Sequence, residues 1–155
     1  MPAPFLRLRL ADTDATASLA KRLAPMLSPG DVLLLDGEIG AGKTTFARAL
    51  IRALLANPVE DVPSPTFTLV QTYIAPAAEV WHCDLYRLTD PQEVLELGLD
   101  EAFETAICLI EWPDRLGAVA PRNALHCSFA AETDHHELAF AGPVSWQERL
   151  AQLHD

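Results

Sequence analysis

Four residues of one short loop have the types and the spacing needed to hold a chain of phosphates. They match the pattern G-x-x-x-x-G-K-[ST] and are Gly37, Gly42, Lys43 and Thr44. Glycines let the backbone curl so that successive N–H groups converge on phosphate oxygens. The lysine supplies a cation for the β- and γ-phosphates, and the hydroxyl supplies a ligand for magnesium.

Such a loop binds phosphate when it joins a strand to a helix, because the positive end of the helix then points at the anion. Residues 32–36 are an apolar run that predicts a strand buried on both faces. Residues 43–55 place Phe46, Leu50 and Leu54 on one helical face. We therefore interpret the loop as a phosphate-binding loop rather than an ordinary glycine turn.

Two carboxylates follow other predicted strands. Asp84 ends the segment VWHCD, and Glu111 ends AICLIE. Parallel α/β sheets bind ligands at the carboxyl ends of their strands, so both residues are placed to hold a metal ion or to orient water. For either residue alone, a solvated carboxylate or a cap is an equal alternative, but two beside a phosphate loop favour metal chemistry.

Thr66 is a third candidate for chemistry. It lies in a loop stiffened by Pro63 and Pro65. GTPases carry a hydroxyl-bearing switch loop at this point in the chain order. The Ser-Pro-Thr segment by itself is a weak signal, because it occurs in many loops.

The remaining pattern predicts one α/β domain spanning residues 1–155, without repeats or linkers. We expect a P-loop NTPase-like fold, in which helices flank a central mixed, mostly parallel sheet. The predicted strands are residues 5–10, 32–36, 68–73, 79–84, 106–112, 124–130 and 137–142. The predicted helices follow a cap at Asp12 or Asp14, the phosphate loop, a capping box at residues 90–93 and a cap at Ser145.

The charge balance argues against direct binding of nucleic acid. Eleven Lys and Arg stand against 22 Asp and Glu, a formal net charge of −11. A protein that grips a phosphate backbone needs many cations, and Lys21 and Lys43 are the only lysines. We expect any role near nucleic acid to pass through a protein partner.

The sequence also favours a cytoplasmic location. No apolar run reaches the roughly 18 residues that span a bilayer, and the N-terminus does not read as a signal peptide. Cys83, Cys108 and Cys127 are far apart, which predicts reduced, buried thiols.

Four segments in this order resemble the TsaE (YjeE) family of small bacterial ATPases. They are GEIGAGKTT, VPSPTFTLV, HCDLYRL and LIEWP, and the resemblance runs from about Gly37 to Pro113. It implies a role in the threonylcarbamoyladenosine modification of tRNA, together with the TsaB and TsaD proteins, of which TsaD carries the transfer chemistry. It also implies ATP, ADP and Mg²⁺ as ligands, with weak ATP hydrolysis that resets or activates the partner complex.

The resemblance assigns roles to individual residues. The phosphate-binding residues would be Gly40, Ala41, Gly42, Lys43, Thr44 and Thr45. Thr44 would also ligate Mg²⁺, and Thr66 would be the switch-like residue. Asp84 would act like a Walker B carboxylate, and Glu111 would be either a metal ligand or the base that orients water. We favour Glu111 as the ligand, with Asp84 behind it, and place Thr13 near the adenine.

One departure from the family pattern lies late in the chain. His135 and His136 stand where family members often carry an arginine. We interpret this pair as a solvent-facing strand end. His82 and Cys83 are interpreted as residues that pack a strand.

Three other functions compete with this one. The glycine spacing also fits a small-metabolite or nucleoside kinase, but such an enzyme needs clustered cations around the transferred phosphate. After residue 90 the chain offers only three arginines, which are not clustered: Arg115, Arg122 and Arg149. A GTPase would need a guanine-reading motif such as N-K-x-D, which is absent from the sequence. A non-catalytic nucleotide sensor is the third alternative. Our hypothesis combines it with hydrolysis: a slow ATPase whose change of shape is recognised by partner proteins.

Overall fold

A computed structural model describes residues 3–65 and 68–154. Seven strands form one sheet in the order β1-β7-β6-β2-β5-β4-β3. The strands are β1 Leu6–Leu10, β2 Val32–Gly37, β3 Val70–Ile74, β4 Glu79–Asp84, β5 Ile107–Glu111, β6 Leu125–Ala131 and β7 His136–Ala141. The helices are α1 Thr13–Leu23, α2 Lys43–Leu55, α3 Gln92–Glu96, α4 Leu99–Thr105 and α5 Val144–Arg149, with 3₁₀ helices η1 Ala24–Met26 and η2 Pro113–Val119.

The direction of the strands confirms the expected mixed sheet. β6, β2, β5 and β4 are adjacent and run parallel, so their carboxyl ends share one edge. β7 pairs antiparallel with β6, β1 pairs antiparallel with β7, and β3 pairs antiparallel with β4. β1 therefore points the same way as the four parallel strands, and β7 begins at the edge where they end.

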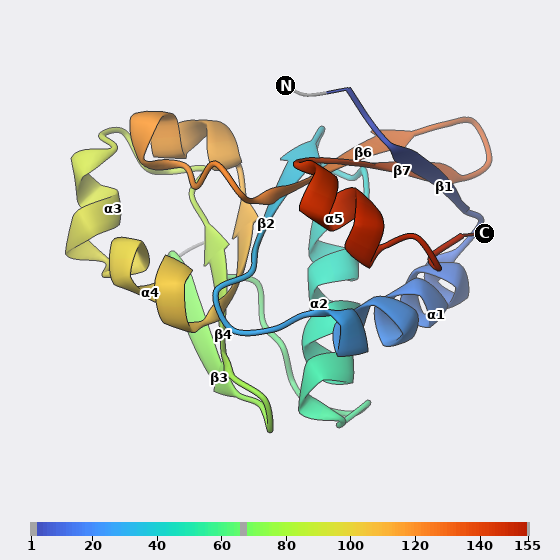
Figure 1. Ribbon diagram of the computed structural model, residues 1–155, viewed down its shortest axis with the longest axis horizontal. Coiled ribbons are helices and arrows are strands. Elements are labelled where there is room, and N and C mark those ends of the chain that lie inside the picture. The colour runs from blue at the N-terminus through green and yellow to red at the C-terminus, as the bar shows by residue number, and fades with distance from the viewer. Residues whose placement is uncertain (1–2, 66–67, 155) are drawn as a thin grey trace.

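Helices cover the sheet on two faces (Figure 1). Leu33 and Leu35 of β2 pack into a core with α1, α2 and α5, whereas Val32 and Leu34 pack into a second core with α3 and α4. Successive side chains of a strand point to opposite faces, so a strand covered on both sides needs apolar residues at every position. This explains the continuous apolar run before the glycine loop.

Helix α2 is fixed against the sheet by large side chains. Phe46 and Leu50 have no exposed surface, and the ring of Phe46 lies 5.4 Å from that of Phe129 in β6, measured between ring centroids. Contacts of this kind stabilise the packing of a helix on a sheet. They place the first turn of α2 at the carboxyl edge of the parallel strands.

The N-terminal predictions are confirmed. Leu8 and Leu10 are buried whereas Arg9 between them is exposed, as a half-buried strand requires. Asp12, one of the two predicted caps, begins α1, and its carboxylate accepts a hydrogen bond from the N–H of Ala15 at 2.8 Å.

Two helix predictions need correction. The helix expected to end near Gly98 does so, at Glu96, but a further helix that was not predicted, α4, begins after Gly98, which has φ +82°. The sequence pattern missed α4 because the helix is too short to give a clear apolar periodicity. It is stabilised by packing, with Leu99 and Ala102 buried. Ser145 does not cap α5, which begins after Pro143 without a side-chain cap.

The three cysteines are free and buried, as predicted. Burial raises the pKa of Cys108 to about 12 and that of Cys83 well above its usual value, so these thiols stay protonated and unreactive at neutral pH. Among the described residues, no helix is long and apolar enough to cross a membrane.

The packing of α2 predicts a large loss of stability for Leu50→Ala. Leu50 is fully buried, so truncation leaves a cavity, and we expect a loss of about 2–5 kcal/mol in the free energy of unfolding. Val59→Ala is the control, because Val59 is 86 % exposed and should change stability by less than about 0.5 kcal/mol. Urea denaturation at neutral pH measures both, and equal losses would contradict the assignment of Leu50 to the core.

Candidate functional site

The glycine loop connects β2 to α2 through two close backbone approaches. Gly37 has φ +140°, and a Cβ added there would lie 2.4 Å from the carbonyl oxygen of Phe129. Gly42 has φ +105°, and a Cβ there would lie 2.9 Å from Nδ1 of His136. Both positions therefore need glycine for conformation and for space. Gly40 has φ +84° with no neighbour within 4 Å of its added Cβ, so it needs glycine for conformation alone.

Lys43 is the first residue of α2 and is 5 % exposed. Its ammonium group donates to the carbonyl oxygen of Gly37 at 2.5 Å and lies 3.8 Å from the ring centroid of Trp112. The ring of Trp112 in turn contacts that of Tyr86, with 4.9 Å between centroids. The cation is thus held over the loop by a carbonyl oxygen and an aromatic face.

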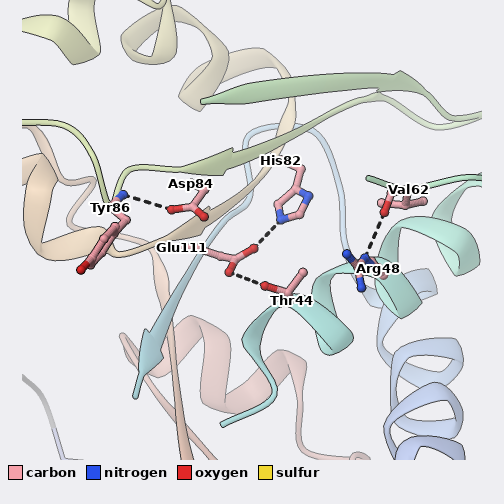
Figure 2. A network of polar contacts seen from close by, with 7 residues as sticks. All are labelled: Thr44, Arg48, Val62, His82, Asp84, Tyr86 and Glu111. Carbon is pink, nitrogen blue, oxygen red and sulfur yellow. Dashed lines mark hydrogen bonds and ion pairs between the residues drawn. The ribbon is translucent and has the colours of Figure 1, made fainter. Parts of the chain in front are cut away.

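The two predicted carboxylates lie side by side at the carboxyl edge of the sheet. Asp84 of β4 and Glu111 of β5 are partners in the register of two parallel strands. They are 7 % and 2 % exposed, which excludes the alternative of solvated strand ends. One oxygen of Asp84 accepts from the N–H of Tyr86 at 3.0 Å (Figure 2).

Glu111 is the centre of a short chain of hydrogen bonds (Figure 2). Its Oε1 accepts from the hydroxyl of Thr44 at 2.8 Å, and its Oε2 lies 2.7 Å from Nε2 of His82. His82 and Asp84 are alternate residues of β4 and point to the same face of the sheet, the face covered by α2. The first turn of α2 therefore meets the ends of two strands.

Thr44 and Glu111 fit a magnesium ion. Both offer hard oxygen donors, and the two atoms that contact each other are 2.8 Å apart. Neighbouring ligands of an octahedral Mg²⁺ at 2.0–2.1 Å are about 3 Å apart, so the pair already has that spacing. Within residues 3–65 and 68–154 no three His, Cys, Asp or Glu side chains gather to hold a metal by themselves. The pair thus suits an ion that takes its other ligands from phosphate and water.

Two cavities meet at the glycine loop. The first, which we name the loop cavity, has a volume of about 400 Å³ and is lined by loop residues and by Ser64, Asp84, Tyr86, Glu111 and Trp112. The second, the α1 cavity, has a volume of about 370 Å³ and is lined by residues 10–13, Thr16 and residues 132–136. Gly42, Thr45 and His136 line both. The arrangement offers one space for phosphates and an adjoining one for a nucleoside.

The structure brings most of the predicted site residues to these two cavities. Thr13 lines the α1 cavity and Thr45 lines both. Ala41 is buried, and its N–H donates to the carbonyl oxygen of Glu38 at 3.1 Å. Thr66 lies outside the described residues. Its role stays a prediction.

The interpretation of the histidine pair needs correction. His135 and His136 are half-buried rather than solvent-facing, and His136 packs against the loop at Gly42. His135 donates to the carboxylate of Asp134 at 2.7 Å. This bond, with Arg9 nearby, holds the pKa of Asp134 below its usual value, so the rim of the α1 cavity keeps a negative charge.

His82 is also more than a packing residue, because it contacts Glu111. Its position two residues before Asp84 was the available signal, since alternate residues of a strand share a face. Cys83 points to the opposite core and packs there, as predicted.

Comparison with known proteins identifies the family. A family model described as "Threonylcarbamoyl adenosine biosynthesis protein TsaE" matches residues 10–138. The chain belongs to the TsaE family. A tRNA threonylcarbamoyladenosine biosynthesis protein TsaE from Bacillus subtilis is 35 % identical over 149 residues, covering 95 % of this chain and 92 % of the relative. One from Rickettsia bellii is 41 % identical over 112 residues, covering 72 % and 77 %.

A solved structure supports the same family. The crystal structure of YdiB from Bacillus subtilis superposes with a TM-score of 0.78 at 29 % sequence identity. The match covers 99 % of this chain and 95 % of YdiB. The fold of the family therefore extends over β1 and α5, beyond the segments that carry the sequence motifs.

The loop geometry predicts different costs for alanine at two glycines. Gly37→Ala adds a clash with a backbone oxygen to an unfavourable φ, so we expect it to destabilise by about 2–5 kcal/mol. In Gly40→Ala the added Cβ contacts no atom, so the loss of stability should come only from the unfavourable φ and amount to about 1–2 kcal/mol. Urea denaturation measures the difference. An equal cost for the two would show that β6 does not approach the loop at Gly37.

Proposed function

We propose that this protein binds and slowly hydrolyses ATP with magnesium in the formation of threonylcarbamoyladenosine in tRNA. The observation that carries the proposal is the contact of Thr44 with Glu111 beside a glycine loop, in a chain of the TsaE family. The nucleotide would lie with its phosphates in the loop cavity. Its adenosine would occupy the α1 cavity, near Thr13.

The chain's own groups account for phosphate binding. Backbone N–H groups of Gly40 and of residues 42–45, together with the positive end of α2, would face the phosphates. Lys43 would exchange its contact with the carbonyl oxygen of Gly37 for the β- and γ-phosphates, since its flexible side chain starts at the same turn.

Thr44 and Glu111 would hold the magnesium ion. When bound, this ion neutralises the charge that develops on the phosphate oxygens. Asp84, in register with Glu111, would hold the attacking water or a water on the metal. Glu111 is best placed as ligand because one of its oxygens already contacts Thr44.

The cation count supports slow hydrolysis. Of the described residues that line the loop cavity, Lys43 is the only lysine or arginine. Fast phosphoryl transfer uses a further cation on the transition state, often supplied by a second protein. Weak intrinsic turnover that rises in a complex follows from this.

TsaB and TsaD are the proposed partners, in the cytoplasm. Ile39 and Tyr86 line the loop cavity and are 79 % and 48 % exposed, so apolar side chains stand at its mouth. Exposed apolar side chains beside a ligand site suit contact with another protein. The net charge of −11 disfavours direct tRNA binding by this chain.

The kinase alternative finds less support. Arg149 pairs with Asp31, which precedes β2 and so lies at the opposite end of that strand from the loop. Arg115 lies over the ring of Tyr86, with 6.0 Å between its guanidinium carbon and the ring centroid. These two late arginines therefore lie at separate places in the fold.

Lys43→Ala tests nucleotide binding. Loss of a charge-assisted hydrogen bond should weaken ATP–Mg binding about 10- to 100-fold in calorimetry, and should abolish support of tRNA modification reconstituted with TsaB and TsaD. Lys21→Ala is the matched control, because Lys21 is exposed on α1 and does not line the loop cavity. If Lys43→Ala bound ATP–Mg with wild-type affinity and still supported tRNA modification, the proposal would be contradicted.

Glu111→Gln tests the metal site. The amide keeps the shape of the side chain but removes its charge, so we expect ATP to bind without its magnesium enhancement. Hydrolysis should fall by about 100-fold or more. Comparing ATP affinity with Mg²⁺ and with EDTA, alongside phosphate release, checks both. Unchanged magnesium dependence would remove Glu111 from the metal site.

A further inference from the structure

His82 is the most completely buried polar residue beside the site. It lies in β4 with no exposed surface, and β4 is flanked by β5 and β3. Its Nε2 lies 2.7 Å from Oε2 of Glu111. Burying an imidazole in a core costs free energy unless its polar atoms are hydrogen-bonded. Here the hydrogen bond goes to a carboxylate that also accepts from Thr44.

The hydrogen-bond inventory assigns the proton on His82. An ionised carboxylate only accepts, so Nε2 must carry the hydrogen in its contact with Glu111. Nδ1 has no hydrogen-bond partner in the part of the chain that the structure describes. Nε2 is therefore the ring nitrogen of His82 that has a partner among the described residues.

We propose that His82 is a positioning residue that fixes the rotamer of Glu111, so that Oε1 stays directed at Thr44 and at the magnesium ion. The inference rests on the proposed function, because it assigns that site's metal to Glu111. A glutamate has three rotatable bonds, and a free one would lose conformational freedom on binding the ion. His82 removes that freedom in advance, as an outer partner of a metal ligand commonly does.

This role differs from simple core packing. A packing residue would affect stability alone, whereas a positioning residue sets the affinity for the metal. Val80 provides the comparison, since it lies on the same strand and the same face as His82, is equally buried and belongs to the core. It is two residues further from Asp84, at the other end of β4.

Three variants separate the two roles. His82→Leu removes the donor, His82→Gln keeps an N–H, and Val80→Ala perturbs the core alone. For each, calorimetry measures ATP affinity in EDTA and the Mg²⁺ concentration that gives half of the magnesium enhancement. Thermal unfolding checks that each variant is folded.

We expect His82→Leu to raise that Mg²⁺ concentration about tenfold and to leave ATP affinity in EDTA unchanged. His82→Gln should stay within about threefold of wild type, because its amide can donate to Glu111. Val80→Ala should lower the unfolding temperature and keep wild-type magnesium dependence. A folded His82→Leu with wild-type magnesium dependence, or an equal shift in Val80→Ala, would overturn the role of His82.

An NMR measurement on nucleotide-free protein tests the contact independently. Imidazole ¹⁵N–¹H correlation spectra should show His82 protonated at Nε2. A ring unprotonated at Nε2 would overturn the inference, even if His82→Leu failed to fold. Absence of magnesium-enhanced ATP binding in the wild-type protein would instead contradict the proposed function, whatever the spectra show of His82.

Discussion

The hydrogen bond from Thr44 to Glu111 joins the first turn of α2 to the end of β5, and the rest of the site depends on it. The two oxygens are spaced like neighbouring ligands of one ion only while the helix holds this position. Phe46 and Leu50, fully buried beneath α2, hold it there. The core below the helix therefore supports the geometry on which the proposed magnesium site depends.

Strand direction explains why the α1 cavity lies next to the loop. β7 runs opposite to β6, so it begins, at His136, on the edge where the parallel strands end. β1 runs opposite to β7, so Leu10 reaches the same edge and leads directly to α1. A turn and a helix start, far apart in the sequence, thereby form the walls of one cavity.

Under the proposed function, the charges of the loop cavity would make the binding of magnesium and the binding of nucleotide depend on each other. Asp84 and Glu111 are buried in the cavity that would receive phosphates. Among the described residues that line this cavity, Lys43 is the only lysine or arginine. Phosphates beside two buried carboxylates repel them strongly at low dielectric, and a divalent cation between them reverses the sign of the interaction. An acidic chain can therefore bind a polyanion in this place when the cation comes with it.

The residue types of the candidate site were predictable from the sequence itself. The glycine loop, the strand before it and the amphipathic helix after it are local patterns, so Lys43 and Thr44 stood out as candidates from spacing alone. The strand-end positions of Asp84 and Glu111 were also predictable, because each ends an apolar run. The strands and most of the helices that form the two cores were predictable from the periodicity of apolar residues. Helix α4 was missed because it is too short to show such a periodicity.

Only the tertiary structure decided which groups meet. The register of β4 and β5 places Asp84 beside Glu111 and brings His82 within reach, and no local pattern specifies the register between strands 20 or more residues apart. The reversal at β7 turned His136 from an expected exposed residue into a neighbour of Gly42. Local spacing selects residue types along a chain, whereas contacts between distant residues depend on how the whole sheet is assembled.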